Sequence, residues 1–189
     1  MSDKRFEDFK IDERLIENMK TIQQITRPTK IQEEAIQLIQ NNEHVLIAAE
    51  TGSGKSHTFL LPIIVSILSR KHKTTNRKFN SPLALILTPR RELAVQLGEM
   101  AEQLCSDLNI NVKVILGGKT KQLMMHPSFE DVDLLIGSLG AISKLTTTGI
   151  YHMEEVRHVV LDESDTLLDD SFTEKLSYFL RRLPVSLEI

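Results

Sequence analysis

The sequence lacks the features of a disulfide-bonded, membrane-spanning or strongly basic protein. It has one cysteine, Cys105, so no disulfide can form within the chain and a reducing compartment is expected. No apolar run approaches the roughly 18 residues that a bilayer-spanning helix needs, so we expect no membrane partner. The 23 Lys and Arg against 26 Asp and Glu leave a formal net charge of −3. Attraction of polyanions by the whole surface is therefore excluded, and any nucleic acid must be held by a local patch.

The 189 residues are 41% hydrophobic and 26% charged, as is typical of a folded domain. The first 42 residues have the spacing of two amphipathic helices, and short apolar runs then alternate with helical segments. The runs that we predict as strands are Val45–Ala49, Leu83–Leu87, Val112–Leu116, Asp133–Ile136 and His158–Leu161. Helices are expected near residues 55–70, 91–107, 119–125, 139–147 and 171–182. Because each apolar run is continuous, the pattern favours an α/β fold with a mostly parallel sheet flanked by helices. Ligands of such sheets bind at the carboxyl ends of the strands.

A phosphate-binding loop is predicted over Ala49-Glu50-Thr51-Gly52-Ser53-Gly54-Lys55-Ser56. Its glycines permit a tight loop whose backbone N–H groups point inward, and the helix that follows adds positive potential at its N-terminus. Lys55 would reach the β- and γ-phosphates, and the Ser56 hydroxyl would bind Mg²⁺. The first position holds Ala where the common pattern has Gly. The alternative is an ordinary glycine-rich turn, which the flanking strand and helix patterns disfavour.

Two adjacent carboxylates, Asp162 and Glu163, follow the last predicted strand. Carboxylates at the end of a buried strand are costly unless a cation or hydrogen bonds compensate them. We predict that Asp162 binds Mg²⁺, partly through water, and that Glu163 is the base that orients or deprotonates an attacking water. As an alternative, these acids would only cap and begin a helix.

These residues resemble the motifs of the first RecA-like domain of a DEAD-box RNA helicase, and the resemblance covers nearly the whole chain. Five motifs stand in the family's order: Arg27-Pro28-Thr29-Lys30-Ile31-Gln32, Ala49 through Ser56, Thr88-Pro89-Arg90-Arg91-Glu92-Leu93-Ala94, Gly117-Gly118 and Asp162-Glu163-Ser164-Asp165. The expected fold is a RecA-like P-loop domain preceded by a helical segment that carries the glutamine motif.

The resemblance implies ATP and Mg²⁺ as cofactors. Thr29 and Gln32 belong to the glutamine motif, and a Gln amide can both donate to and accept from the adenine edge. Guanine would present O6 in place of the N6 amino group. Phe6 is the expected aromatic that stacks on the purine, with Phe9 as a rival for that role.

The resemblance also implies single-stranded RNA, bound through its backbone without regard to sequence. The implied contacts are Pro89, Arg90, Arg91, Gly117, Gly118, Ser138 and Gly140. Helix N-terminal amides at such turns can bind phosphates. Two departures affect this surface: Arg90 replaces the family's Thr, and Ser138-Leu139-Gly140-Ala141 replaces Thr-Pro-Gly-Arg. Asp165 is the implied residue for coupling between domains.

The expected domains are residues 1–42, a helical extension with the glutamine motif, and residues 43–189, a RecA-like ATP-binding domain that ends before any Ser-Ala-Thr motif. The family's second RecA-like domain supplies arginines for hydrolysis, so this chain alone is expected to be nearly inactive. The implied function is ATP-dependent RNA unwinding or ribonucleoprotein remodelling. A DNA or RNA translocase of the wider helicase superfamily and an RNA-binding scaffold without ATPase activity are the alternatives. A GTPase is disfavoured because the sequence has no Asn-Lys-x-Asp motif.

A finer resemblance concerns the compartment. Leu139-Gly140-Ala141 and residues 165–172 are similar to a metazoan mitochondrial DEAD-box subfamily that is tied to mitochondrial ribosome assembly. The mitochondrion is therefore the leading prediction, with a transit peptide absent from this sequence. Ribosome-assembly factors are the implied partners, and the nucleus, nucleolus or cytoplasm are the alternatives.

Overall fold

A computed structural model describes residues 4–50, 52–71 and 77–184. Its elements in chain order are η1 (Phe6–Phe9), α1 (Glu13–Thr21), α2 (Lys30–Gln40), α3 (Lys55–Lys71), β1 (Ala84–Thr88), α4 (Arg91–Leu104), β2 (Val112–Ile115), α5 (Thr120–Met125), β3 (Leu134–Ser138), α6 (Leu139–Thr147), β4 (His158–Leu161), α7 (Ser164–Leu167) and α8 (Asp170–Leu180). The chain divides into two compact units. Of the described residues, the first unit holds 4–50, 52–71 and 100–110, and the second holds 77–99 and 111–184.

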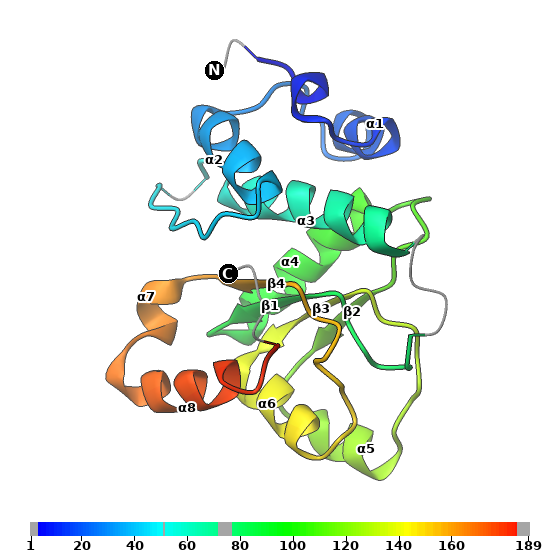
Figure 1. The fold of residues 1–189 in the computed structure, drawn as a ribbon, viewed down its shortest axis with the longest axis vertical. Coiled ribbons are helices and arrows are strands. Elements are labelled where there is room, and N and C mark those ends of the chain that lie inside the picture. The colour runs from blue at the N-terminus through cyan, green and yellow to red at the C-terminus, as the bar shows by residue number, and fades with distance from the viewer. Residues whose placement is uncertain (1–3, 51, 72–76, 185–189) are drawn as a thin grey trace. The chain divides into compact units, whose positions relative to one another are not determined.

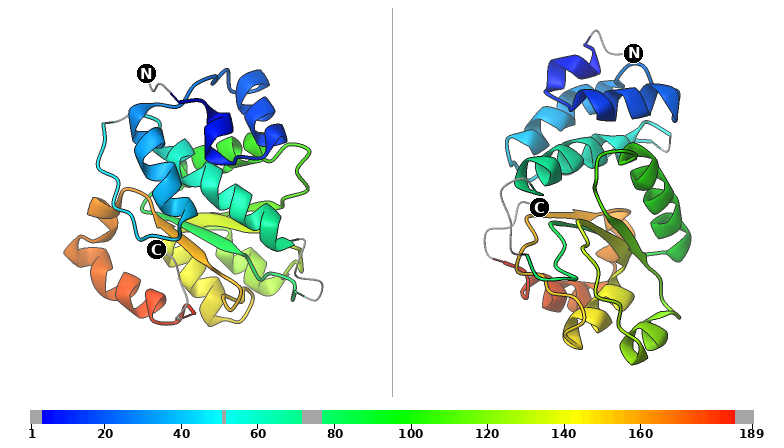
Figure 2. Two further views of the ribbon diagram at one scale, coloured as in Figure 1. Left: turned by 45° about the horizontal axis from the view of Figure 1, so that its top comes forward. Right: turned by 90° about the vertical axis from the view of Figure 1, so that its right-hand side faces the viewer.

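The first unit is helical, and α2 lies beside α3 within it (Figures 1 and 2). The start of α2 is set by Thr29, whose backbone N–H donates to Gln32 Oε1 at 2.9 Å while its hydroxyl accepts from the Gln32 N–H. This reciprocal capping box satisfies two backbone donors that the first helical turn would otherwise leave unpaired. The two helices predicted before residue 43 are confirmed as α1 and α2.

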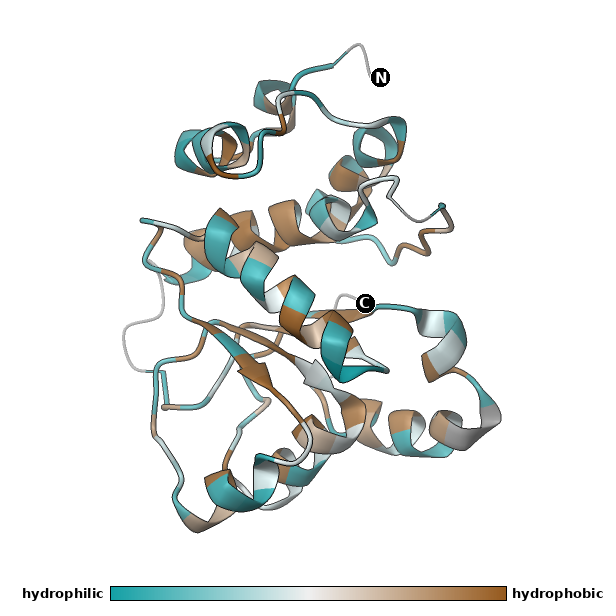
Figure 3. Cartoon of the chain, turned by 180° about the vertical axis from the view of Figure 1, so that it is seen from behind, coloured by the Kyte–Doolittle hydropathy of each residue, from teal (hydrophilic) through white to brown (hydrophobic). Residues whose placement is uncertain are grey.

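The middle of helix α3 is apolar, as its brown colour in Figure 3 shows. Every residue from His57 to Ile64 is buried. A helix that is apolar on all sides is a buried helix, which explains why α3 has no solvent-facing polar stripe over these two turns. No helix of the described ranges is both long enough and apolar enough to cross a membrane.

The second unit is built on a parallel sheet in the order β2-β3-β1-β4. β1 pairs with β3 on one side and with β4 on the other, and all five of its residues are buried. On one face of the sheet, α6, α7 and α8 contribute to an apolar core, with Phe179 of α8 and Leu145 of α6 fully buried there. The predicted α/β fold with a parallel sheet flanked by helices is confirmed.

One predicted strand is wrong. Residues 45–49 have no strand structure, and the Leu46 side chain is 86% exposed. Their apolar composition suits a buried strand, but a strand exists only where a neighbouring edge satisfies its backbone N–H and C=O groups. No strand of the described residues pairs with this segment, so the phosphate-loop sequence follows a segment without regular secondary structure.

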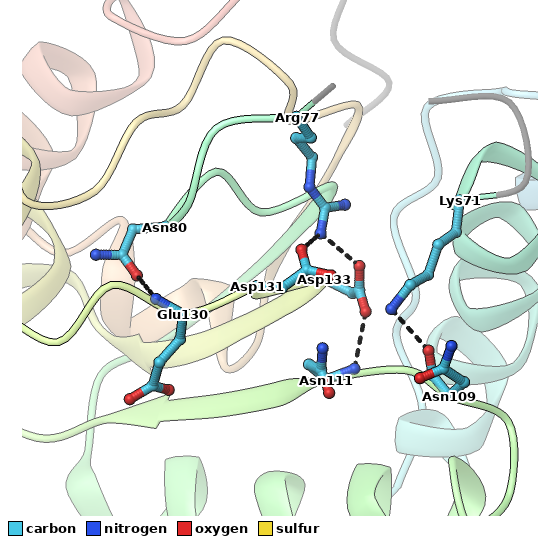
Figure 4. A network of polar contacts seen from close by, with 8 residues as sticks. All are labelled: Lys71, Arg77, Asn80, Asn109, Asn111, Glu130, Asp131 and Asp133. Carbon is cyan, nitrogen blue, oxygen red and sulfur yellow. Dashed lines mark hydrogen bonds and ion pairs between the residues drawn. The ribbon is translucent and has the colours of Figure 1, made fainter. Parts of the chain in front are cut away.

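A buried ion-pair network lies at the amino ends of β2 and β3 (Figure 4). Arg77 Nη2 donates to Asp133 Oδ1 at 2.7 Å and also to Asp131 Oδ1. The other Asp133 oxygen, Oδ2, accepts from the Asn111 N–H at 2.8 Å. The Asp133 side chain is fully buried, and that of Arg77 is 7% exposed. The network therefore fixes the segments that lead into three strands, β1 through Arg77, β2 through Asn111 and β3 through Asp133.

We expect Arg77→Met to lower the free energy of unfolding by about 3–5 kcal/mol, because it removes the cation that faces the buried Asp133 carboxylate. Denaturant unfolding followed by circular dichroism measures the change. Lys20→Met is the matched control: it removes an ion pair with Glu7 whose side chains are 39% and 52% exposed, and the expected loss is at most about 1 kcal/mol. Equal losses in the two variants would contradict the structural role of the network.

A second expectation concerns Tyr151, which is 4% exposed. Burial, with a further contribution from the Glu130 charge, raises the pKa of the Tyr151 phenol to about 12. Because the unfolded-state pKa is about 10, the stabilisation from neutral Tyr151 is complete below pH 10 and is lost as the pH rises through the folded-state value.

The measurement is the tyrosinate absorbance of a Tyr178→Phe variant, in which Tyr151 is the remaining tyrosine of the two. The absorbance is expected to rise near pH 12 in the folded protein and near pH 10 in urea. A rise near pH 10 while circular dichroism still reports the folded state would overturn this assignment.

Candidate functional site

The predicted phosphate loop belongs to the first unit, where it leads into the first turn of α3. Gly52 and Gly54 have φ values of +82° and +93°, which suit glycine. The Lys55 amine points back into the loop and donates to the carbonyl oxygens of Ala49 and Glu50, the latter at 3.1 Å. The Ser53 hydroxyl oxygen is buried and has no hydrogen-bond partner among the described residues. The loop thus holds a cation and an unsatisfied hydroxyl at the N-terminus of a 17-residue helix. Thr51 lies outside the described residues.

The glutamine motif is attached to this loop by two hydrogen bonds. Thr29 Oγ1 donates to the Ser53 carbonyl at 2.9 Å, and Gln32 Nε2 donates to the Gly54 carbonyl at 3.1 Å. Gln32 is 2% exposed. The structure therefore brings together two predicted sites that are separated by some twenty residues of sequence, and the capping residues of α2 also position the phosphate loop.

Phe6 was expected to stack on a purine, and the structure argues against that role. The Phe6 ring is fully buried, and the rival Phe9 is 1% exposed. Both rings come from η1, a short turn whose two phenylalanines contribute to the core of the first unit, where burial of an aromatic ring is strongly favourable. Neither ring presents a free face to a base.

In the second unit, the other predicted residues gather along one edge of the sheet. All four strands are parallel, so their carboxyl ends lie on the same side. The predicted residues at or just after these ends are Gly117 and Gly118 beyond β2, Ser138 and Gly140 at β3, Pro89, Arg90 and Arg91 beyond β1, and Asp162 and Glu163 beyond β4. Asp165 is exposed on α7, which follows directly.

The turn between β1 and α4 directs two adjacent arginines to different neighbours. The buried Thr88 closes this turn by donating from its hydroxyl to the Arg90 carbonyl at 2.8 Å. Arg91 lies near the glycine pair: a Cβ atom on Gly118 would stand 3.8 Å from Arg91 Nη1. Arg90 Nη2 instead lies 3.3 Å from Glu163 Oε2. The sequence predicted a role for each of these four residues but did not indicate that Arg91 lies near Gly118 or that Arg90 pairs with Glu163.

The acidic turn after β4 continues the pairing with β1, since the Asp162 N–H donates to the Leu87 carbonyl at 2.9 Å. Glu163 then adopts a left-handed conformation with φ +50° and ψ +52°. A non-glycine residue in this region is uncommon and is found disproportionately at functional sites. Glu163 Oε2 is buried and has no hydrogen-bond partner among the described residues apart from its ion pair with Arg90.

The described residues contain no cluster of three or more His, Cys, Asp or Glu side chains that could hold a metal by themselves. The oxygen donors predicted for Mg²⁺, the Ser56 hydroxyl and the Asp162 carboxylate, belong to different units. Mg²⁺ typically takes one or two protein oxygens together with phosphate oxygens and water. Each of these two groups is an oxygen donor of the kind that Mg²⁺ accepts, and the phosphate loop adds a buried Ser53 hydroxyl that has no hydrogen-bond partner among the described residues.

Comparisons with known proteins agree on one family. The family model described as DEAD/DEAH box helicase matches residues 29–188. The chain is 34% identical over 177 residues to mouse "Probable ATP-dependent RNA helicase DDX28", covering 91% of this chain and 32% of that protein. It is 35% identical over 166 residues to "Pre-mRNA-splicing ATP-dependent RNA helicase PRP28" of Debaryomyces hansenii, covering 84% of this chain and 28% of that protein. The chain thus spans about a third of the length of these curated relatives.

Among solved structures, the fold is similar to that of S. cerevisiae Dbp5 L327V bound to Gle1 H337R and IP6. The TM-score is 0.82 at 23% sequence identity, with 98% of this chain and 45% of that chain covered. At this identity the similarity establishes the fold.

The contact between the phosphate loop and the glutamine motif can be tested at Gly54. A Cβ atom there would lie 2.5 Å from Gln32 Nε2, at a backbone φ that disfavours side chains. We expect Gly54→Ala to lower the free energy of unfolding by about 1–3 kcal/mol. Gly140→Ala is the control because nothing lies within 4 Å of its Cβ position in α6, and alanine is expected to leave stability unchanged or to raise it by up to about 1 kcal/mol. If thermal unfolding shows no difference between the two variants, the loop does not depend on this contact.

Proposed function

The chain belongs to the DEAD/DEAH box helicase family, and from that premise we propose that it is the ATP-binding part of an ATP-dependent RNA helicase that unwinds RNA or remodels ribonucleoproteins. The observation that carries the proposal is the attachment of the glutamine motif to the phosphate loop, through the bonds from Thr29 to Ser53 and from Gln32 to Gly54. Base recognition and phosphate binding are thereby combined in one small structure.

The phosphate loop binds the nucleotide phosphates through its backbone N–H groups and the N-terminus of α3. Lys55 supplies the positive charge. In this structure its amine bonds two carbonyl groups of the loop itself, Ala49 and Glu50. A phosphate replaces these neutral acceptors with a charged one, and charge-assisted hydrogen bonds are roughly twice as strong. The buried Ser53 hydroxyl, which has no partner among the described residues, gains one when a phosphate binds.

Adenine recognition by Gln32 is consistent with its remaining hydrogen-bonding capacity. A Gln amide has two N–H donors and two acceptor sites on its oxygen. One donor bonds Gly54 and one acceptor site bonds Thr29. One donor and one acceptor site remain, which match adenine N7 and the N6 amino group. Guanine offers O6 where adenine has the amino group, so this pattern favours ATP over GTP.

For hydrolysis, Ser56 and Asp162 would hold Mg²⁺, which neutralises the charge that develops on the phosphates. Glu163 orients the attacking water and accepts its proton. We propose that a second RecA-like domain, contacted through Asp165, completes the site with arginines, since such residues can contribute on the order of 10³–10⁵ in rate.

RNA binds along the carboxyl edge of the sheet in the second unit. The N-terminus of α4 (14 residues) and that of α6 (9 residues) offer backbone amides to phosphates. Arg91 beside Gly118 and the exposed Arg90 add charge locally, which a protein of net charge −3 needs for a polyanionic partner. These contacts read phosphate and not sequence. The mitochondrion, with ribosome-assembly factors as further partners, remains our leading hypothesis for the compartment, and the nucleus, nucleolus or cytoplasm are the alternatives.

The test is calorimetric titration of the chain with Mg-ADP and Mg-GDP. We expect a preference for ADP of about tenfold or more, because a paired base edge is worth roughly 1–3 kcal/mol of discrimination. Gln32→Ala is expected to abolish that preference. Gln37→Ala, an exposed position on the same helix, is expected to retain it. Equal affinity of the unsubstituted chain for both nucleotides would contradict the adenine-reading role and favour a helicase-superfamily protein without base selectivity.

A further inference from the structure

The turn after β1 carries Arg90 at the position where the DEAD-box motif has Thr. Its guanidinium does not extend along the RNA-binding edge with Arg91 but lies beside Glu163, with 3.3 Å between Arg90 Nη2 and Glu163 Oε2. The pairing follows from strand order, because β1 and β4 are neighbours and Leu87 is in register with Leu161. Residues just past these two strand ends are therefore adjacent across the sheet edge.

The ion pair is built so that it can be broken. The Arg90 side chain is 63% exposed, whereas that of Glu163 is 35% exposed. Ion pairs of this exposure typically change an equilibrium constant by no more than about fivefold. A guanidinium that is so accessible and so weakly held is available to an incoming phosphate.

The Glu163 carboxylate has little else to hold it. Its Oε2 atom is buried and makes no hydrogen bond with the described residues. Its backbone is in the left-handed region, so the neighbouring structure determines where the side chain points. Among the described residues, Arg90 is therefore the polar side chain that lies against Glu163 Oε2.

We propose that Arg90 is a switch between the catalytic carboxylate and RNA: without RNA it pairs with Glu163 and restrains it, and a backbone phosphate of RNA competes for the guanidinium and releases Glu163 to act as the base. The proposal rests on the proposed function and assigns Arg90 as a positioning residue for it. Coupling of this kind must be reciprocal, so RNA weakens the Arg90–Glu163 pair by the same factor by which the pair weakens RNA binding.

Competition follows from the charges. A phosphate prefers the two parallel N–H groups of the guanidinium fork. Drawing that fork toward RNA removes Nη2 from Glu163, and keeping both contacts would hold a phosphate close to a carboxylate of the same sign. Arg91, adjacent in sequence and close to Gly118, makes no contact with Glu163 in this arrangement and serves RNA alone.

The test is a double-mutant cycle on RNA affinity, measured by fluorescence anisotropy with a labelled oligouridylate of about ten nucleotides and without nucleotide or Mg²⁺. Glu163→Gln is expected to raise RNA affinity about 1.4- to fivefold in the protein that retains Arg90, the range that an exposed ion pair supports. In a protein that already carries Arg90→Gln, Glu163→Gln is expected to change RNA affinity no more than the control substitution Glu92→Gln does.

The control is Glu92→Gln, which removes a side chain of the same charge from an exposed position in the first turn of α4. It reports the general effect of removing one negative charge near RNA, and this effect is expected to be the same in both backgrounds. If Glu163→Gln changes affinity no more than Glu92→Gln, or by equal factors with and without Arg90, the switch is refuted.

A second readout is the rate of ATP hydrolysis by a protein that includes the proposed second RecA-like domain. Arg90→Gln is expected to raise the RNA-free ATPase rate and to reduce the stimulation by RNA, whereas Arg90→Lys, which keeps the charge, is expected to restore most of the stimulation. An unsubstituted protein that binds no oligouridylate would contradict the proposed RNA partner itself. One that binds RNA and shows an additive cycle would leave the proposed function intact and refute only the switch.

Discussion

The pairing of β1 with a parallel strand on each side is the constraint on which the second unit depends. All five β1 residues are buried and in register with β3, and four of them are also in register with β4. A strand in this position can satisfy its backbone groups only if both neighbours are in place. The consequence for chemistry is that the turn after β1 lies between the turns of β3 and β4. Arg90 and Arg91 follow β1, so the acidic turn after β4 lies on one side of them, and the turns after β3 and β2, the latter with the glycine pair, lie on the other.

The first unit depends on a different kind of interaction, the polar contacts of a helix start. Thr29 and Gln32 cap α2 and also bond the carbonyl groups of Ser53 and Gly54. The same side chains thus stabilise a helix and hold a loop whose two glycines have positive φ. Because Gly54 is in contact with the Gln32 amide, movement of this loop on binding phosphate would reach the residue that we propose reads the base.

The departures from the family pattern shift the positive charge along the sheet edge. At the turn after β3, Ala141 stands where an arginine is expected, and this side chain is buried in the core of the second unit. At the turn after β1, Arg90 adds a cation that lies beside Glu163. In this chain a cation therefore lies beside Glu163, the carboxylate that we propose is the base, and this contact is the basis of the proposed coupling between RNA binding and hydrolysis.

Local motifs by themselves determined the glycine-rich loop before α3, the helices α1 and α2, four of the five predicted strands and the adjacent carboxylates after β4. These features depend on residue type at close spacing: glycine where φ is positive, Thr and Gln three residues apart, and continuous apolar runs. Only the tertiary structure decided that residues 45–49 form no strand, because pairing requires a neighbouring edge. It also decided that Phe6 is buried, since aromatic residues that pack in a core and those that stack on a base look alike in sequence. The Arg90–Glu163 pair, separated by more than seventy residues, exists because β1 and β4 are neighbours, and strand order is a property of the folded sheet.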